Sequence, residues 1–332
     1  MDIVRRYPTL TRPQTEKALP MITIKPSSAT ADTAYWIDLF EPDDSDRAQV
    51  ETGCGFRLPS RADLQEIESS SRHYMDKGRV FLSTPFVTRD AEVGVTVLTP
   101  VGFVLDQKRV ITQRFGHAEL FYKLFAATDE RADIGGCEAF CMIMEAMVDH
   151  AADHLEGIGG ELDQISRRIF HVSGKARRTS SETNLETTLS QVGYLGERIG
   201  QVRGAILGLG RIIPYVAETV TDWLTPEQVA RLSVARQDLI SLADYESHLA
   251  NKVQFLLDAV LGFINIDQNN VVKILTIVSV VGVPPVLIAG VYGMNFKAMP
   301  ELEWKYGYAY ALVLMLVTTL APLIWFRWKK WF

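Results

Sequence analysis

Two long uncharged stretches dominate the C-terminal part of the chain. One runs over 23 residues from Ile274 to Phe296, and the other over 21 residues from Tyr306 to Phe326. A helix of about 20 apolar residues crosses the roughly 30 Å hydrocarbon core of a bilayer. Only nine residues separate the stretches, too few for a folded domain. The pattern therefore predicts a hairpin of two membrane-spanning helices, with both ends of the chain on one side.

Basic residues predict which side that is. Three of them lie in the tail 327–332, directly after the second span, and Lys273 directly precedes the first. The two lysines of the loop between the spans are offset by Glu301 and Glu303. The positive-inside rule then places both termini in the cytoplasm. Because the N-terminal residues contain no apolar run typical of a signal peptide, we expect a plasma (inner) membrane protein with a cytosolic body.

A long helix is predicted directly before the first span. Thr225, Pro226 and Gln228 match a capping box, and neither Gly nor Pro occurs between Glu227 and Leu261. Apolar residues follow heptad spacing, which predicts that this stalk helix packs against other helices. We call these eight residues the heptad seam: Leu232, Leu239, Leu242, Leu249, Val253, Leu256, Val260 and Phe263. A helix that continues to about Tyr292 would have 66 residues and measure about 100 Å.

The N-terminal part carries short β-like runs separated by Gly and Pro. They occupy residues 21–25, 34–39, 79–87, 94–99, 102–106 and 109–114. Ser60 and Asp63 match the N-cap and N3 positions of a helix between them. After about residue 118 the pattern becomes helical, and 172–182 predicts a turn between two long helices. We therefore predict an α/β domain followed by helices, without an internal repeat.

Charge and motifs limit the function classes. Residues 273–332 carry a net charge of +4 while the whole chain carries −6, so residues 1–272 carry −10. An acidic body does not favour nucleic-acid binding. The sequence contains no P-loop, GxSxG or HExxH motif. Its three cysteines, Cys54, Cys137 and Cys141, form no zinc or disulfide pattern. We expect neither an enzyme nor a bound cofactor.

One histidine pair has metal-ligand spacing. "DHAADH" places His150 and His154 four residues apart, with Asp149 and Asp153 beside them. Such a pair could bind a transition metal. A solvated helix face is the interpretation that we favour from the sequence.

One face of the first span is free of carboxylates. It comprises, in steps of three and four, Asn269, Val272, Leu275, Ser279, Val283, Val286 and Gly290, and Asn295 follows just beyond. We call these seven residues the predicted pore face. Small residues there allow close packing of helices, which is one interpretation. The other is a pore lined by several copies around an axis, as in a homo-oligomer with cyclic symmetry.

Three stretches carry a specific resemblance. "GVYGMNF" (290–296) followed by "MPEL", "LGFINIDQNN" (261–270) and "WIDLFEPDDSDR" (36–47) resemble the CorA family of divalent-cation channels. The resemblance is strong over 260–332 and weak over 50–220. It implies a homopentamer in the lipid bilayer, built from an α+β cytosolic domain (an α/β/α funnel), stalk helices and two spans per chain. The implied cargo is hydrated Mg²⁺, with Co²⁺ and Ni²⁺ on the same path, and Mg²⁺ is also the implied regulatory ion.

The resemblance also implies residue roles. A selectivity ring falls on Gly293, Met294 and Asn295, and an inner amide ring falls on Asn269. A hydrophobic gate falls on Val272, Leu275 and Val283. Val286 departs from the family pattern, since some members carry threonine there. Glu301 and Glu303 would add negative potential at the mouth, and Asp244 and Asp258 are candidates for sensing cytosolic Mg²⁺.

The expected organisation follows from these boundaries. Residues 1–224 form the cytosolic domain, 225–270 the stalk, 271–296 and 306–326 the two spans, 297–305 the loop, and 327–332 a basic tail. A Zn²⁺ transporter of the ZntB type is the alternative, but that branch typically has isoleucine where this chain has Met294. A membrane-tethered enzyme and a purely structural anchor are further alternatives, and neither explains an asparagine at the lip of a span.

Overall fold

The computed structural model describes residues 21–66, 68, 72–89, 96–129, 134–171, 181–294, 304–329 and 331. The chain divides into two compact units. The first comprises Met1–Val172 and Ser190–Gln254, and the second comprises Ser173–Leu189 and Phe255–Phe332.

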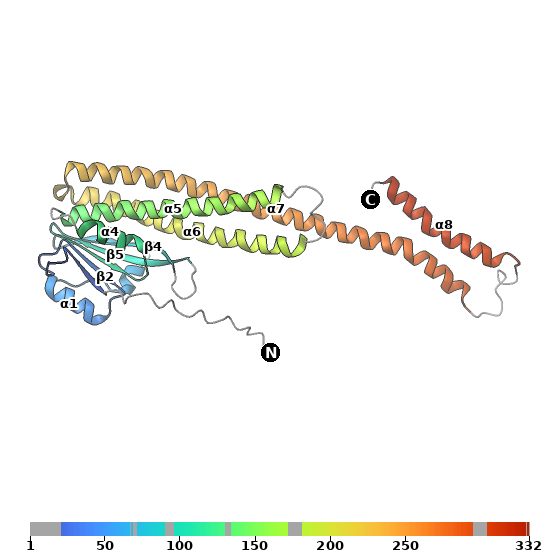
Figure 1. Ribbon diagram of the computed structural model, residues 1–332, viewed down its shortest axis with the longest axis horizontal. Coiled ribbons are helices and arrows are strands. Elements are labelled where there is room, and N and C mark those ends of the chain that lie inside the picture. Colours follow the sequence, from blue (N-terminus) through green and yellow to red (C-terminus); the bar gives the residue numbers. More distant parts are fainter. Residues whose placement is uncertain are drawn as a thin grey trace. The chain divides into compact units, whose positions relative to one another are not determined.

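One mixed sheet forms the centre of the first unit (Figure 1). Its order is β1-β2-β6-β5-β4-β3, in which β2 and β6 are parallel and all other neighbours are antiparallel. The strands are β1 (Ile22–Lys25), β2 (Trp36–Phe40), β3 (His73–Asp76), β4 (Arg79–Arg89), β5 (Thr96–Leu105) and β6 (Val110–Arg114).

Two features of this sheet differ from the sequence prediction. The runs 94–99 and 102–106 were predicted as separate strands, but 96–105 is the single strand β5. Pro100 pairs with Pro85 of β4 and precedes Val101, where pairing with β6 begins, so its missing N–H removes no bond from that ladder. Strand β3 was missed because its "HYMD" sequence is mostly polar and exposed.

Helices cover both faces of the sheet. On one face, Ile37, Leu39 and Ile111 pack with Val50 of α1 (Asp44–Cys54) in a buried apolar cluster. On the other face, aromatic side chains meet helices α4 (Glu119–Asp129) and α5 (Gly136–His171). Their ring pairs are Trp36 with Phe121 and Phe125, Phe86 with Phe121, and Phe103 with Phe140. The result is the predicted α+β class, with helix, sheet and helix in three layers.

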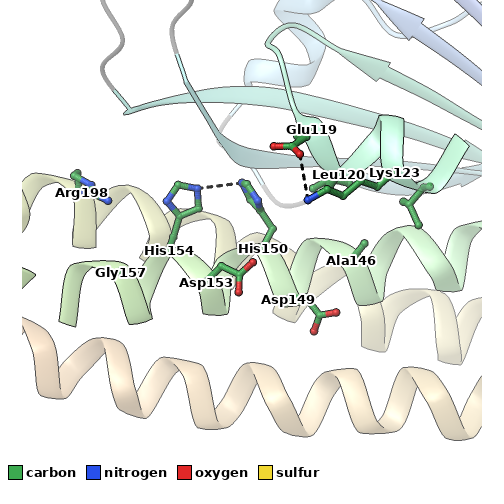
Figure 2. A pocket seen from close by; sticks show the side chains of 11 residues that line it. Glu119, Leu120, Lys123, Ala146, Asp149, His150, Asp153, His154, Gly157 and Arg198 are labelled. Carbon is green, nitrogen blue, oxygen red and sulfur yellow. Dashed lines mark hydrogen bonds and ion pairs between the residues drawn. The ribbon is translucent and has the colours of Figure 1, made fainter. Parts of the chain in front are cut away.

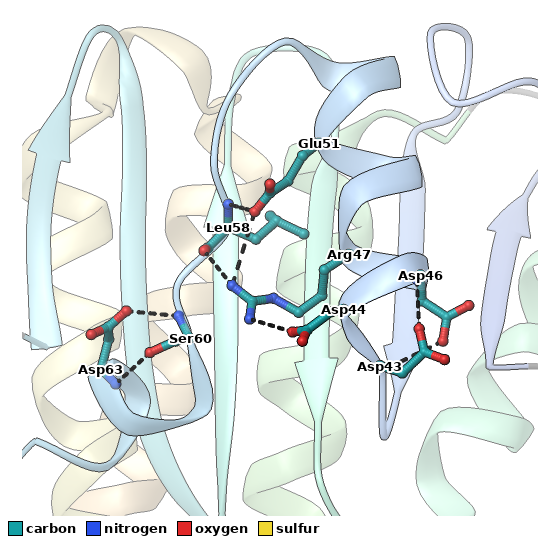
Figure 3. Close-up of polar contacts among 8 residues, drawn as sticks. All are labelled: Asp43, Asp44, Asp46, Arg47, Glu51, Leu58, Ser60 and Asp63. Carbon is teal, nitrogen blue, oxygen red and sulfur yellow. Dashed lines mark hydrogen bonds and ion pairs between the residues drawn. The ribbon is translucent and has the colours of Figure 1, made fainter.

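Helix α2 (Arg61–Gln65) begins where the sequence predicted (Figure 3). The Asp63 N–H donates to Ser60 Oγ at 3.2 Å, and the Ser60 N–H donates to Asp63 Oδ2 at 2.7 Å. Hydrogen bonds from Ser60 to the carboxylate hold the pKa of Asp63 below its usual value. The helix has only five residues, so the predicted start is confirmed and the longer helix over "LPSRADLQEIESSSR" is not. The same box starts α1 at Asp43 and Asp46.

A buried ion pair joins β2 to β6. Arg114 Nε donates to Asp38 Oδ2 at 2.9 Å, and the two side chains are 2% and 1% exposed. The Thr112 hydroxyl donates to Asp38 Oδ1 at 2.5 Å and accepts from the Trp36 indole N–H at 3.0 Å. Burial raises the pKa of Asp38, and Arg114 and Thr112 oppose that rise. Paired in this way, the carboxylate stays buried beneath α4.

The long helices of the first unit pack against each other. Helix α6 (Ser181–Thr219) is followed by the short 3₁₀ helix η2 (Thr221–Trp223) and by α7 (Pro226–Tyr292). Arg231 of α7 binds Glu138 and Glu145 of α5, each at 2.6 Å. Lys252 of α7 binds Asp163 of α5 at 2.5 Å.

The heptad seam is covered, within this unit, by the same chain. Leu232, Leu239, Leu249 and Val253 are buried. A Cβ added at Gly159 of α5 would lie 3.6 Å from Leu249, and one added at Gly196 of α6 would lie 3.3 Å from Val253. The predicted packing against other helices is therefore confirmed, but these partners are intramolecular. The seam is no argument for an oligomer.

Helix α7 has 67 residues and is unbroken from Pro226 to Tyr292, as the sequence predicted. The Gln228 N–H donates to Thr225 Oγ1 at 3.2 Å, and the Thr225 N–H donates to Gln228 Oε1 at 3.0 Å, which confirms the capping box. Helix α8 (Gly307–Trp328) follows. Both α7 and α8 contain stretches long and apolar enough to cross a membrane.

We predict that Asp38→Ala lowers the free energy of unfolding of the first unit by about 3–5 kcal/mol, because it leaves the Arg114 guanidinium buried without its counter-charge. Thermal unfolding of the purified protein in detergent, followed by near-ultraviolet circular dichroism, measures this. Glu119→Ala is the matched control, since it removes a carboxylate whose ion pair with Lys123 is exposed and should cost less than about 1 kcal/mol. Equal stability of the two variants would contradict the role assigned to the buried pair.

Candidate ion pathway

The predicted pore face lies on the part of α7 that belongs to the second unit. Its four large apolar residues, Val272, Leu275, Val283 and Val286, are between 59% and 71% exposed. Asn269, Ser279 and Gly290 are also exposed. A single chain therefore leaves this whole face uncovered, so it is available to line a path or to contact another copy.

Most of the half-buried residues on this part of α7 lie on a different side of the helix from the predicted pore face. Between Val271 and Tyr292 the half-buried positions are Thr276, Ile277, Val281, Pro284, Pro285, Ile288 and Tyr292. At 100° per residue, all of these except Thr276 lie on the side of the helix opposite the predicted pore face. Helix α8 is the other long helix of this unit (Figure 1). The span therefore has one side that is partly covered within its own chain and one side that is not.

The polar side chains of the span bond to its own backbone. The Ser279 hydroxyl donates to the carbonyl of Leu275 at 2.9 Å, and the Thr276 hydroxyl donates to the carbonyl of Val272 at 2.8 Å. Each hydroxyl oxygen keeps its lone pairs for accepting further hydrogen bonds. Ser279 thus places an acceptor among the apolar residues of the predicted pore face.

Helix α7 ends directly before the predicted selectivity residues. The Gly293 N–H donates to the carbonyl of Ala289 at 2.9 Å, and the Met294 N–H donates to that of Val291 at 3.3 Å. A Cβ added at Gly293 would lie 3.0 Å from the Ala289 carbonyl oxygen, so a side chain there would require that carbonyl to shift slightly. Asn295, Glu301 and Glu303 lie outside the described residues, so their predicted roles are not tested.

The two regulatory candidates do not form a pair within one chain. Asp244 and Asp258 are both exposed on α7, fourteen positions apart. Sequence reasoning named Asp149 and Asp153 only beside the histidines and overlooked the denser group of acids that they form with Glu145 in the first unit. Burial and the neighbouring charges of Asp153, Glu145 and Asp238 raise the pKa of Asp149. The spacing of Glu145, Asp149 and Asp153 by four residues was the available signal, since it places them on one helix face.

His150 and His154 do not lie on a solvated helix face, and that interpretation was wrong. Both imidazoles are half-buried in a pocket between α4, α5 and α6 (Figure 2). The His150 ring stacks on Phe86 with 4.9 Å between ring centroids, and its Nε2 lies 3.1 Å from the Val87 carbonyl oxygen of β4. Among the described residues, no cluster of three or more His, Cys, Asp and Glu side chains is placed to hold a metal ion.

Comparison with known proteins places these features in a family. A family model described as CorA-like Mg²⁺ transporter protein matches residues 31–330. The magnesium transport protein CorA of Escherichia coli (strain K12) is 32% identical over 324 residues, which cover 97% of this chain and 96% of that protein.

Two solved structures extend the comparison to the fold. The complete CorA magnesium transporter from Methanocaldococcus jannaschii superposes with a TM-score of 0.69 at 18% identity, covering 90% of this chain and 91% of that one. The cytoplasmic domain of ZntB from Vibrio parahaemolyticus gives a TM-score of 0.53 at 13% identity, covering 76% of this chain and 96% of that domain.

Proposed function

The chain belongs to the CorA-like Mg²⁺ transporter family, and we propose that it conducts hydrated divalent cations, chiefly Mg²⁺, across a membrane. The observation that carries the proposal is the uncharged, uncovered face of α7 that ends at the Gly293–Asn295 triplet. The same path would accept Co²⁺ and Ni²⁺. In this proposal both termini are cytoplasmic, the membrane is the inner membrane, and the chain is a transporter rather than an enzyme.

A pore made from this face requires several copies of the chain. One helix face cannot enclose a path, and the partly covered side of α7 points away from it. A closed ring with cyclic symmetry brings five identical faces around one axis and leaves no face unpaired. Membership of the family supports five copies. The heptad seam is no evidence for or against a pentamer, because its partners lie within the same chain.

The ligands proposed for the pore entrance suit a hydrated ion. Mg²⁺ sheds its water reluctantly and prefers octahedral oxygen geometry. A ring of Asn295 amides offers carbonyl oxygens that accept hydrogen bonds from the ion's water shell. A ring of carboxylates would bind the ion more tightly and slow its release, whereas conduction needs an ion that both enters and leaves. Glu301 and Glu303 would raise the local cation concentration without contacting the ion.

Apolar rings further along the path are proposed to form the gate. Val272, Leu275 and Val283 would each become a ring of hydrocarbon in a symmetric assembly. A narrow apolar ring resists wetting, and a divalent cation cannot replace its water shell there. Cytosolic Mg²⁺ bound between acidic surfaces, with Asp244 and Asp258 as candidates, would hold this ring narrow by neutralising repulsion between subunits. Closure then needs only a small inward movement of α7.

Zn²⁺ transport of the ZntB type remains the alternative. The similarity to the ZntB domain is a similarity of fold at 13% identity, and Met294 differs from the isoleucine typical of that branch. The higher identity to magnesium transport proteins favours Mg²⁺.

We predict that Asn295→Ala reduces Mg²⁺ flux into proteoliposomes by at least about tenfold, roughly what the loss of 1.4 kcal/mol of ion stabilisation produces. The oligomer should assemble normally, because the change removes only the amide of one side chain that follows α7 in the sequence. Asn251→Ala, which removes an exposed amide of α7 outside the span, is the control and should conduct as wild type. Unchanged flux through a correctly assembled Asn295→Ala protein would rule out the selectivity ring.

We predict a pentamer of about 186 kDa of protein, from five chains of 37.2 kDa, in mild detergent. Light scattering combined with refractive index, which separates protein from detergent mass, measures this. A monomer or dimer that still transports Mg²⁺ after reconstitution would exclude the symmetric pore.

We predict that Leu275→Asp leaks at millimolar cytosolic Mg²⁺, where the wild type is nearly shut, because a charged ring stays wet even when narrow. Ion current across a planar bilayer measures the leak. Leu275→Met keeps volume and apolarity and should remain shut. If the Asp variant is expressed, assembled and as quiet as the Met variant, the gate lies elsewhere on α7.

A further inference from the structure

A pocket of about 450 Å³ lies between α4, α5 and α6 of the first unit, apart from the predicted pore face (Figure 2). The proposed transport mechanism uses none of its side chains. Polar and charged groups line much of it: Glu119, Lys123, Asp149, His150, Asp153, His154 and Arg198. Several of these are already paired, since Lys123 binds Glu119 and Arg198 binds Glu161. The two imidazoles are the groups whose arrangement needs an explanation.

The imidazoles present the same nitrogen to each other. His150 Nε2 and His154 Nε2 are 3.2 Å apart, with their rings nearly perpendicular at 77°. Two neutral imidazoles can share only one hydrogen at such a contact. With the hydrogen on His150 Nε2, that N–H points to the Val87 carbonyl and to the lone pair of His154 Nε2. His154 Nε2 is then an acceptor that faces the pocket without a hydrogen of its own.

The same separation fits two ligands of one metal ion. Zinc–nitrogen bonds of 2.0–2.1 Å at a tetrahedral angle place the two nitrogens about 3.3 Å apart. The four-residue spacing on α5 therefore holds the two nitrogens at the separation that a chelate requires. The hydrogen of His150 would move to Nδ1, and its bond to Val87 would be exchanged for the metal bond.

Both imidazoles of the pair are neutral in this pocket, which leaves their nitrogens able to act as ligands. Burial lowers the pKa of His150, and burial together with His150 lowers that of His154 to about 4, so both rings are neutral near pH 7. Neutral imidazole is the form that binds metals. Asp153 attracts positive charge to both rings, whereas Lys123 near His150 and Arg198 near His154 oppose it. Within the described residues neither Asp149 nor Asp153 forms an ion pair.

We propose that His150 and His154 together bind one transition-metal cation, Zn²⁺, Co²⁺ or Ni²⁺, through their Nε2 atoms, with water as the remaining ligands. Imidazole nitrogen suits these ions, whereas Mg²⁺ prefers carboxylate, carbonyl and water oxygen. Two protein ligands leave the ion exchangeable, because the described residues provide no third side chain. The site thus distinguishes transition metals from Mg²⁺ on the domain outside the membrane, and it does not depend on the proposed transport function.

Co²⁺ titration of the full-length, tag-free protein in detergent tests this site. Excess Mg²⁺ is kept present to occupy oxygen sites, and the visible absorption of nitrogen-bound Co²⁺ is followed. We expect one such ion per chain in the wild type. His154→Ala should weaken its binding by more than about tenfold, the lower end of the loss caused even by removing an outer partner of a ligand. His248→Ala, which removes an exposed histidine of α7, is the control and should bind as wild type.

His154→Cys separates a ligand from a merely structural residue. A cysteine at this position should keep Co²⁺ bound and add a sulfur-to-cobalt charge-transfer band, because thiolate also ligates these metals. Asn295→Ala is altered only at the proposed pore entrance and should bind Co²⁺ as wild type. The Co²⁺ titration therefore tests the histidine site independently of the proposed pore. Absence of nitrogen-bound Co²⁺ in the wild type, or equal binding by His154→Ala and wild type, would overturn the site and leave a hydrogen-bonded histidine pair.

Discussion

The backbone of a segment that crosses a bilayer must satisfy its hydrogen bonds within itself, because the hydrocarbon offers no partner. Helix α7 meets this constraint by remaining helical from Pro226 to Tyr292. One helical period therefore governs both its packing in the first unit and its membrane-length part in the second. Buried Leu249 and Val253 face α5 and α6 in the first unit, and an uncovered apolar face follows in the second. The adjacent prolines at 284 and 285 are tolerated because they lie on the partly covered side, away from the predicted pore face.

Charged side chains are absent from the membrane-length part of α7 and join helices and strands elsewhere. From Ile274 to Tyr292 the helix carries no ionisable side chain other than Tyr292 itself, whereas the part of α7 in the first unit is joined to α5 by Arg231 and Lys252. Such partly exposed bridges contribute little stability each, but they fix which side of α7 meets α5. The heavily buried pair of Asp38 and Arg114 has another role, since it lies at the β2–β6 junction, the one parallel pairing of the described sheet. Ion pairs thus fix how α7 meets α5 and how β2 pairs with β6, which apolar packing alone would not determine.

Sequence patterns predicted the elements whose signal is local. The capping boxes at Ser60 and Thr225 were visible because two residues, at the N-cap and N3 positions, determine each, and the length of α7 was visible because nothing interrupts it. Strand β3 was not visible, since its pairing with β4 compensates for a polar sequence. The extent of β5 was also missed, because a proline outside the β6 ladder does not end a strand. The partners of the heptad seam could not be read from its spacing, since the same spacing serves packing within one chain and between chains.

The candidate site residues were likewise predictable where helical spacing decides their position, and not where residues distant in the chain surround them. The predicted pore face depends only on helical period, and the described helix leaves its residues together and exposed. The environment of His150 depends on Phe86 and Val87, more than sixty residues away in the chain, so spacing alone suggested a solvated face. Ligand type explains why the proposed pore and the proposed histidine site would serve different ions. Hydrated Mg²⁺, Co²⁺ and Ni²⁺ are similar in size, so neutral oxygens that bind the water shell separate them poorly. Nitrogen ligands contact the metal itself and discriminate by bond preference. A chain that admits ions by their hydration therefore needs a site of the second kind wherever it must tell Mg²⁺ from a transition metal.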